Sequence, residues 1–153
     1  MSAKLPSRTT IGTALAVVGA VFIGYIGMSY LLAPQSMAPS FGLPSWPRGE
    51  GAGFLAVKGI RDVVSGLVIL AILVIGNRRV LGWVMLAMAL TPFGDMIIVL
   101  QSGGAPATAF GVHGATAAAV ILAGSLLLSG SRPQPATPLA APQVPRGGLS
   151  RSA

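Results

Sequence analysis

Four long apolar stretches, separated by short polar segments that contain glycine or proline, dominate this chain of 153 residues. A helix needs about 20 residues to cross the hydrocarbon core of a bilayer. The stretches 11–33, 53–76, 80–101 and 105–129 are all long enough. The pattern therefore predicts an all-α fold, a four-helix transmembrane bundle in one membrane domain that covers 11–130.

The segments between the stretches carry ordinary signals for helix ends. Pro34 follows the first stretch, and glycine, asparagine and two arginines at 76–79 follow the second. A serine and two glycines at 102–104 end the third stretch. Pro106 opens the fourth, because proline is tolerated in a first helical turn. These signals predict three connections between the spans.

The longest connection and the two flanks have different characters. Segment 34–52 contains four prolines together with Phe41, Leu43 and Trp46, which predicts either an irregular connection or a lid at the outer membrane interface. Residues 1–10 form the predicted cytoplasmic N-terminus. The proline-rich tail 131–153 has little to bury, so we expect it to be disordered.

The composition supports a lipid environment. The chain is 53% hydrophobic and 8% charged, with a mean hydropathy of +0.79. Soluble domains carry roughly a quarter charged residues. We therefore expect a multi-pass protein of the cell membrane, with membrane lipid as its main partner. Cysteine is absent, which excludes disulfides, thiolate metal sites and a cysteine nucleophile. We expect no metal and no cofactor.

The net charge of +7 lies in the flanks and in one connection. The basic residues there are Lys4, Arg8, Arg78, Arg79, Arg132, Arg146 and Arg151. In a four-span topology they share one side, while Arg48 and Glu50 cancel on the other. The positive-inside rule then predicts that both termini are cytoplasmic. We expect no nucleic-acid partner, because no basic stripe with interleaved aromatic residues exists.

Ionisable residues inside the spans are the main chemical signal. Lys58, Arg61 and Asp62 lie in the second stretch, where such groups are costly and need partners. Asp95 in the third stretch and His113 in the fourth are the only others. Counted from the outer helix ends at a rise of 1.5 Å per residue, all five lie roughly 8–14 Å deep. They are predicted to form one polar layer in the outer half of the bilayer.

The spacing of Lys58, Arg61, Asp62 and Ser65 places them on one helical face, which lipid cannot solvate. This face is therefore predicted to look into the bundle. Lys58 and Asp62 are expected to pair at i, i+4. Arg61 is then free for a bidentate contact with Asp95 across the bundle.

Other features add to this layer. Tyr25 on the first stretch lies roughly 12 Å deep, at the height of the charges. Pro92 has no N–H to donate to the carbonyl of Met88, which predicts a kink close to the third-stretch aspartate.

Small residues predict where helices pack closely, because they let helix backbones approach. Gly59 and Gly66 are expected to do this on the second stretch. On the fourth stretch, small residues recur every four positions, at Ala107, Gly111, Ala115, Ala119 and Ala123.

An ordered set of short motifs resembles one family. The motifs are Leu-Ala-Pro at 32–34, Phe-Gly-Leu-Pro at 41–44, Lys-Gly-Ile-Arg-Asp at 58–62 with Gly66, Gly-Asp at 94–95, and His-Gly-Ala at 113–115. Over about residues 10–130 the chain resembles a family of small bacterial and fungal membrane proteins, the domain-of-unknown-function family numbered 4267. The resemblance implies a four-helix membrane protein and no assigned reaction. A more distant similarity is to DoxX-like four-helix membrane proteins.

The sequence leaves three interpretations of the polar layer open. It is a structural ion network, a pocket that binds or converts a small lipophilic molecule by acid–base chemistry, or part of a proton-coupled transporter that works as a homo-oligomer. Whether the protein is an enzyme is not decided. The candidate catalytic residues are Asp62, Asp95 and His113, and the candidate binding or network residues are Lys58, Arg61, Tyr25 and Ser65.

Overall fold

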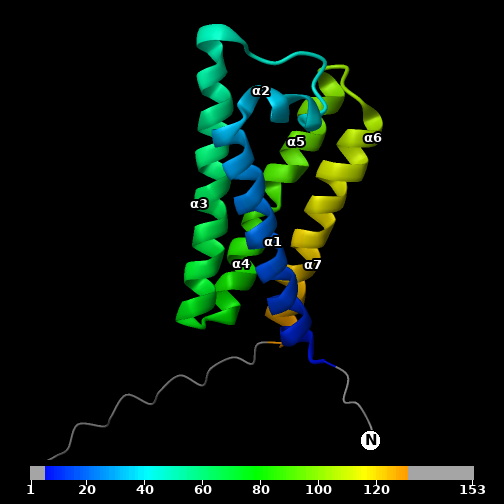
Figure 1. Cartoon of the computed structure of the whole chain (residues 1–153). Coiled ribbons are helices and arrows are strands. Elements are labelled where there is room, and N and C mark those ends of the chain that lie inside the picture. The colour runs from blue at the N-terminus through cyan, green and yellow to red at the C-terminus, as the bar shows by residue number, and fades with distance from the viewer. Residues whose placement is uncertain (1–5, 131–153) are drawn as a thin grey trace, which may run out of the picture.

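The computed structural model describes residues 6–130, and within this range the chain is helical, with no strand. The flanks 1–5 and 131–153, including the tail predicted to be disordered, lie outside the described residues. The long helices stand side by side, and the described part of the chain begins and ends at the lower end in Figure 1. We call this the terminal end and the opposite one the upper end.

The first two long helices agree closely with the predicted stretches. Helix α1 (Arg8–Leu32) begins after Ser7, whose hydroxyl oxygen accepts a hydrogen bond from the Thr10 N–H at 3.1 Å. Helix α3 (Gly53–Ile75) ends at Gly76, which has a φ of +83°. Glycine suits this position because a left-handed conformation carries no Cβ penalty there.

The third stretch is one rod with a break. Helix α4 (Arg78–Met88) ends and α5 (Leu90–Gln101) begins on either side of a turn at Ala89. The break lies about one turn before Pro92, as expected for a residue that cannot donate to the preceding turn. It separates the lower half of the rod from the upper half that carries Asp95.

The fourth stretch contains a feature that the sequence did not predict. It begins with α6 (Pro106–Thr108), continues as a π-helical segment η3 (Ala109–Gly114), and ends as α7 (Ala115–Gly130). A π-helical turn holds more residues than an α-helical one and is frequent at functional sites. Here it includes His113.

Among residues 6–130, three helical rods are long and apolar enough to cross a membrane, namely Arg8–Leu32, Arg78–Gln101 and Pro106–Gly130. Many large apolar side chains on the helices point outward, including Val18 at 66% and Leu67 at 58% exposure. Lipid accounts for such a surface better than water does. Helix α3 has 23 residues but carries three ionisable side chains.

The helices pack around a buried apolar cluster near the terminal end. A cluster of buried residues joins α1, α3, α4 and α7 there, and its members are Ala16, Ala20, Ile69, Leu81, Met85, Ala123 and Leu127. Glycines allow the closest approaches: Gly59 of α3 faces Gly27 of α1, and Gly82 of α4 faces Gly124 of α7. The prediction that Gly59 and Gly66 serve close packing is confirmed by these contacts and by the approach of Gly66 to Ala20.

The predicted small-residue stripe on the fourth stretch is wrong as a packing surface. Ala107, Gly111, Ala115 and Ala119 are exposed, and only Ala123 is buried. Four residues turn an α-helix by about 400°, so a four-residue repeat drifts by about 40° per step and leaves any one face. The π-helical turn shifts the register further.

The connection 33–52 folds into short helices over the upper end, namely α2 (Pro34–Met37), η1 (Ala38–Phe41) and η2 (Gly49–Ala52) (Figure 1). Several hydrogen bonds hold it. The Gln35 side-chain amide donates to the carbonyl of Pro47 at 3.0 Å, and the Trp46 indole donates to Gln35 at 3.2 Å. The backbone N–H of Ala105 donates to the carbonyl of Gly42 at 3.3 Å.

Candidate functional site

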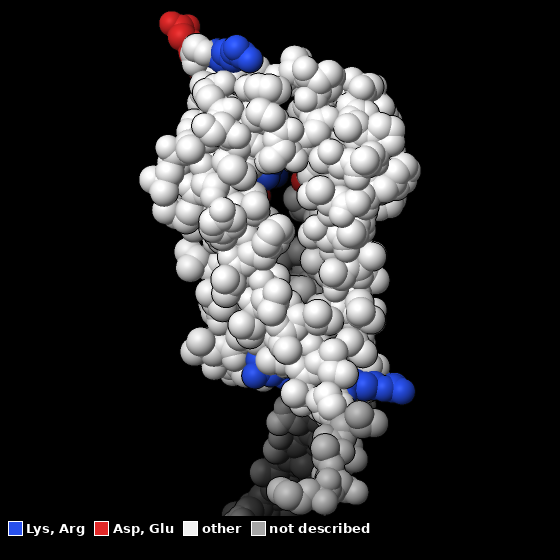
Figure 2. Space-filling view, turned by 45° about the vertical axis from the view of Figure 1, so that its right-hand side comes forward, with Lys and Arg blue, Asp and Glu red and all other residues white. Residues whose placement is uncertain are grey.

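A cavity of about 190 Å³ extends from η1 near the upper end down to Ile69 and Met85 of the buried cluster. Helices α1, α3, α4, α5 and α7, together with η1 and η3, contribute to its wall. Most lining side chains are apolar, and Lys58, Asp62, Asp95 and His113 line it too. On the face shown in Figure 2 a hollow exposes blue and red atoms inside an otherwise white band of surface.

One ion pair lies on the α3 side of the cavity. The Lys58 Nζ donates to Asp62 Oδ2 at 2.5 Å, one helical turn apart, and Asp62 is only 8% exposed. The ammonium also lies 4.7 Å from the ring centre of Tyr30 and 5.4 Å from that of Phe41. Aromatic faces attract cations at such distances. The expected i, i+4 pair is therefore formed, and two aromatic rings stabilise its cation.

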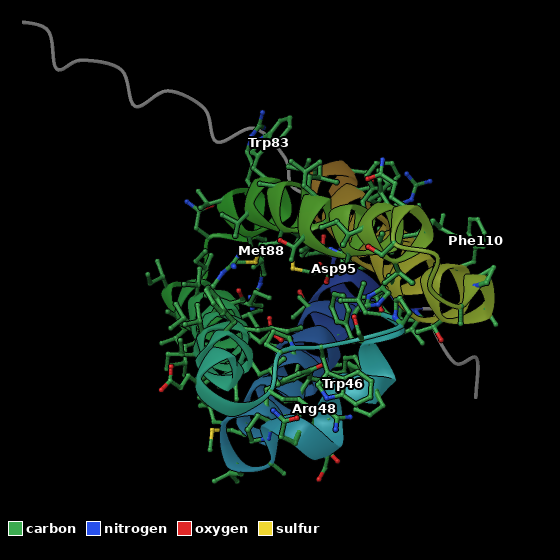
Figure 3. The ribbon with its side chains drawn as sticks, turned by 90° about the horizontal axis from the view of Figure 1, so that it is seen from above. Trp46, Arg48, Trp83, Met88, Asp95 and Phe110 are labelled. Carbon is green, nitrogen blue, oxygen red and sulfur yellow. The ribbon has the colours of Figure 1, made fainter. Side chains whose placement is uncertain are left out.

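A second polar pair lies across the cavity. His113 Nδ1 is 3.9 Å from Asp95 Oδ2, and His113 is 8% exposed. Asp95 points into the space between the helices when the molecule is seen from above (Figure 3). In the same view Trp83 and Phe110 point outward. The third and fourth stretches thus bring Asp95 and His113 together, as their similar depth in the bilayer predicted.

His113 is also tied to the short helices over the upper end. Its Nε2 lies 2.8 Å from the carbonyl oxygen of Phe41, and the imidazole and phenyl rings of the two residues contact each other at a tilt of 56°, with 4.7 Å between their centroids. A carbonyl oxygen can only accept, so Nε2 carries the hydrogen and Nδ1 faces Asp95. The π-helical register of η3 places the imidazole where it reaches both η1 and α5.

Two predicted site residues do not line the cavity. Arg61 is exposed, and within residues 6–130 it forms no ion pair with Asp95, so the predicted bidentate contact is not made. Arg61 lies about 100° around the helix from Asp62, at the edge of the polar face. Tyr25 is 66% exposed and lies outside the cavity. Ser65 does line it, with its hydroxyl donating to the carbonyl of Arg61 at 2.9 Å.

Several lining residues were missed by sequence reasoning. Tyr30 rather than Tyr25 supplies the aromatic side chain of α1, and its hydroxyl donates to the carbonyl of Met37 at 3.3 Å. Phe41 reaches the cavity from η1. The motif at 41–44 and the lid interpretation were the only signals for Phe41. Among the described residues, no group of three or more His, Cys, Asp or Glu side chains is placed to hold a metal ion.

An apolar helical assembly with polar pairs around a cavity defines a helical protein of the membrane class. The profile of a family described as a domain of unknown function (DUF4267) matches residues 19–127. The chain belongs to this family, which confirms the resemblance seen in its motifs. No curated protein and no solved structure matches the chain.

Proposed function

We propose that α3 is a fourth span and that the protein is a multi-pass protein of the cell membrane with both termini in the cytoplasm. Its 23 residues match the length of the other rods, beside which it packs (Figure 1). The Lys58–Asp62 pair removes two of its three charges from contact with lipid. Arg8, Arg78 and Arg79 lie at the terminal end, the side that the positive-inside rule assigns to the cytoplasm.

Single cysteines test this topology, because the chain has no cysteine of its own. Ser45→Cys lies in the connection between α1 and α3, and Asn77→Cys lies in the turn between α3 and α4. In intact cells an impermeant maleimide should label Ser45→Cys only, and Asn77→Cys should react after lysis. Labelling of both positions in intact cells, or of neither, would contradict the fourth span.

We infer that the cavity binds a small lipophilic molecule that carries a polar group. The observation that carries this proposal is the combination of a 190 Å³ space, a mostly apolar wall and two polar pairs. A purely structural ion network would need no space, because protein interiors are close-packed with few voids larger than a water molecule. An apolar cavity of about 150 Å³ is enough for benzene.

Blocking the cavity tests the proposal directly. Gly19 lines the cavity, and a Cβ added there would meet nothing within 4 Å, so Gly19→Leu can fill space without a backbone clash. Gly24→Leu is the matched control, because Gly24 is on the same helix, has equal room and does not line the cavity. Native mass spectrometry should detect a bound small molecule on wild type and on Gly24→Leu, and not on Gly19→Leu. Equal occupancy in all three, or none in wild type, would refute the proposal.

Acid–base conversion of the bound molecule is a second candidate, favoured by the His113–Asp95 pair. A histidine and a carboxylate facing the same space can take up and return a proton. A chemical change in the extracted ligand that wild type produces and Asp95→Asn does not would support it. Proton flux in liposomes that depends on Asp95 would instead favour proton-coupled transport by an oligomer.

A further inference from the structure

The chemistry of the cavity restricts the polar group that it can accept, if the proposed binding function holds. Lys58 is the only lysine or arginine among the described lining residues. Its ammonium is already paired with Asp62 at 2.5 Å and lies near two aromatic rings. Arg61, the nearest other cation in sequence, is exposed and does not line the cavity. No uncommitted cation therefore faces the space.

Acceptors, in contrast, are available. Within residues 6–130 the Asp95 carboxylate has no hydrogen bond, and His113 Nδ1 lies 3.9 Å from its Oδ2. That distance exceeds a hydrogen bond. An imidazole that donates from Nε2 to the Phe41 carbonyl presents Nδ1 as its acceptor. Two acceptors therefore face each other; an amino group can donate to both, and a hydroxyl, which has one hydrogen, can donate to either of them.

We infer that the polar end of the ligand is a hydrogen-bond donor, an alcohol or an amine, held between Asp95 and His113. An anionic end such as a carboxylate would meet the carboxylates of Asp95 and Asp62 without a free cation. Like charges in a site of low dielectric repel strongly. The donor end, in contrast, gains a hydrogen bond to a charged acceptor, which is stronger than a neutral one.

The apolar part of the ligand has a defined path. A second hollow of about 170 Å³ lies between α1 and α7 and shares Gly19, Phe22, Met85, Thr116 and Val120 with the cavity. Its other lining residues, Leu15, Val18 and Ala119, are apolar. A tail that starts at the polar pairs therefore leaves along the α1–α7 surface, towards lipid. The ligand class is a single-chain or ring-bearing lipophilic alcohol or amine.

A matched series of probes tests this assignment on the full chain in lipid nanodiscs. Binding of n-decanol, n-decylamine and n-decanoate is measured by isothermal titration calorimetry, with empty nanodiscs subtracted. At neutral pH the alcohol or the amine should bind about tenfold tighter than the carboxylate, as one charge-assisted hydrogen bond predicts. The stronger of the two shows the net charge of the site, since a site with net negative charge favours the amine over the alcohol.

Two variants separate the possible failures. Asp95→Asn should weaken the alcohol or amine about tenfold, while Glu50→Gln, which removes an exposed carboxylate of η2, should leave binding unchanged. Decanoate binding that equals or exceeds that of the other probes, and that Gly19→Leu abolishes, would overturn the inference and keep the proposed function. No binding of any probe to wild type would overturn both. The ranking of the probes on wild type does not depend on whether a variant folds.

Discussion

The contact between Gly27 of α1 and Gly59 of α3 gives the sharpest stability prediction. A Cβ added at Gly27 would lie 2.6 Å from the Gly59 carbonyl oxygen, 2.6 Å from the Val63 backbone nitrogen and 2.8 Å from a Val63 methyl. A Cβ at Gly59 would lie 2.8 Å from the Gly27 carbonyl oxygen. Backbone atoms cannot rotate away, so Gly27→Ala must push the two helices apart.

The size of the effect follows from the distances. Ordinary contact begins near 3.4 Å, so the helices must separate by 3.4 − 2.6 = 0.8 Å at this point. A gap of that size forfeits a quarter to a half of each dispersion contact along the interface. Overpacking of this kind costs about 1–3 kcal/mol. The higher helix propensity of alanine returns about 0.5–1 kcal/mol, which leaves a net loss of between about 0 and 2.5 kcal/mol.

The assay is unfolding by SDS in mixed dodecyl maltoside micelles, followed by far-UV circular dichroism. Gly24→Ala is the control, because a Cβ there meets nothing within 4 Å and only the propensity gain remains. The double variant Gly27→Ala/Gly59→Ala should lose less than the sum of the two single losses, since one separation relieves both clashes. A Gly27→Ala protein as stable as Gly24→Ala would refute the reasoning.

Two further predictions concern the polar pairs. Asp62→Asn leaves the Lys58 ammonium without its carboxylate and should destabilise the protein by about 2 kcal/mol or more in the same SDS titration. Replacing both Lys58 and Asp62 by leucine should cost less stability than Asp62→Asn alone. A double variant that loses as much stability as Asp62→Asn, or more, would contradict this. His113→Phe keeps an aromatic ring against η1 but removes the hydrogen bond to the Phe41 carbonyl. Amide hydrogen exchange at Gly42 should therefore accelerate. Unchanged protection of this amide would show that the hydrogen bond does not hold the short helices in place.

The apolar pattern by itself determined the helices and the approximate positions of their ends. Long apolar runs have no other stable form in lipid, where each backbone polar group must be satisfied within the helix. The same pattern placed Lys58, Asp62, Asp95 and His113 at one height, because helical rise is constant. The break in the third rod also followed from the chemistry of Pro92.

Only the tertiary structure decided which side chains meet. Whether Arg61 or Lys58 faces the cavity depends on a rotation of α3 that the Gly27–Gly59 contact sets. The rotation of α1 likewise decides that Tyr30 lines the cavity and that Tyr25 is exposed. The π-helical turn at His113 and the cavity itself arise from packing between elements distant in sequence, and local pattern carries no information on the space left between them.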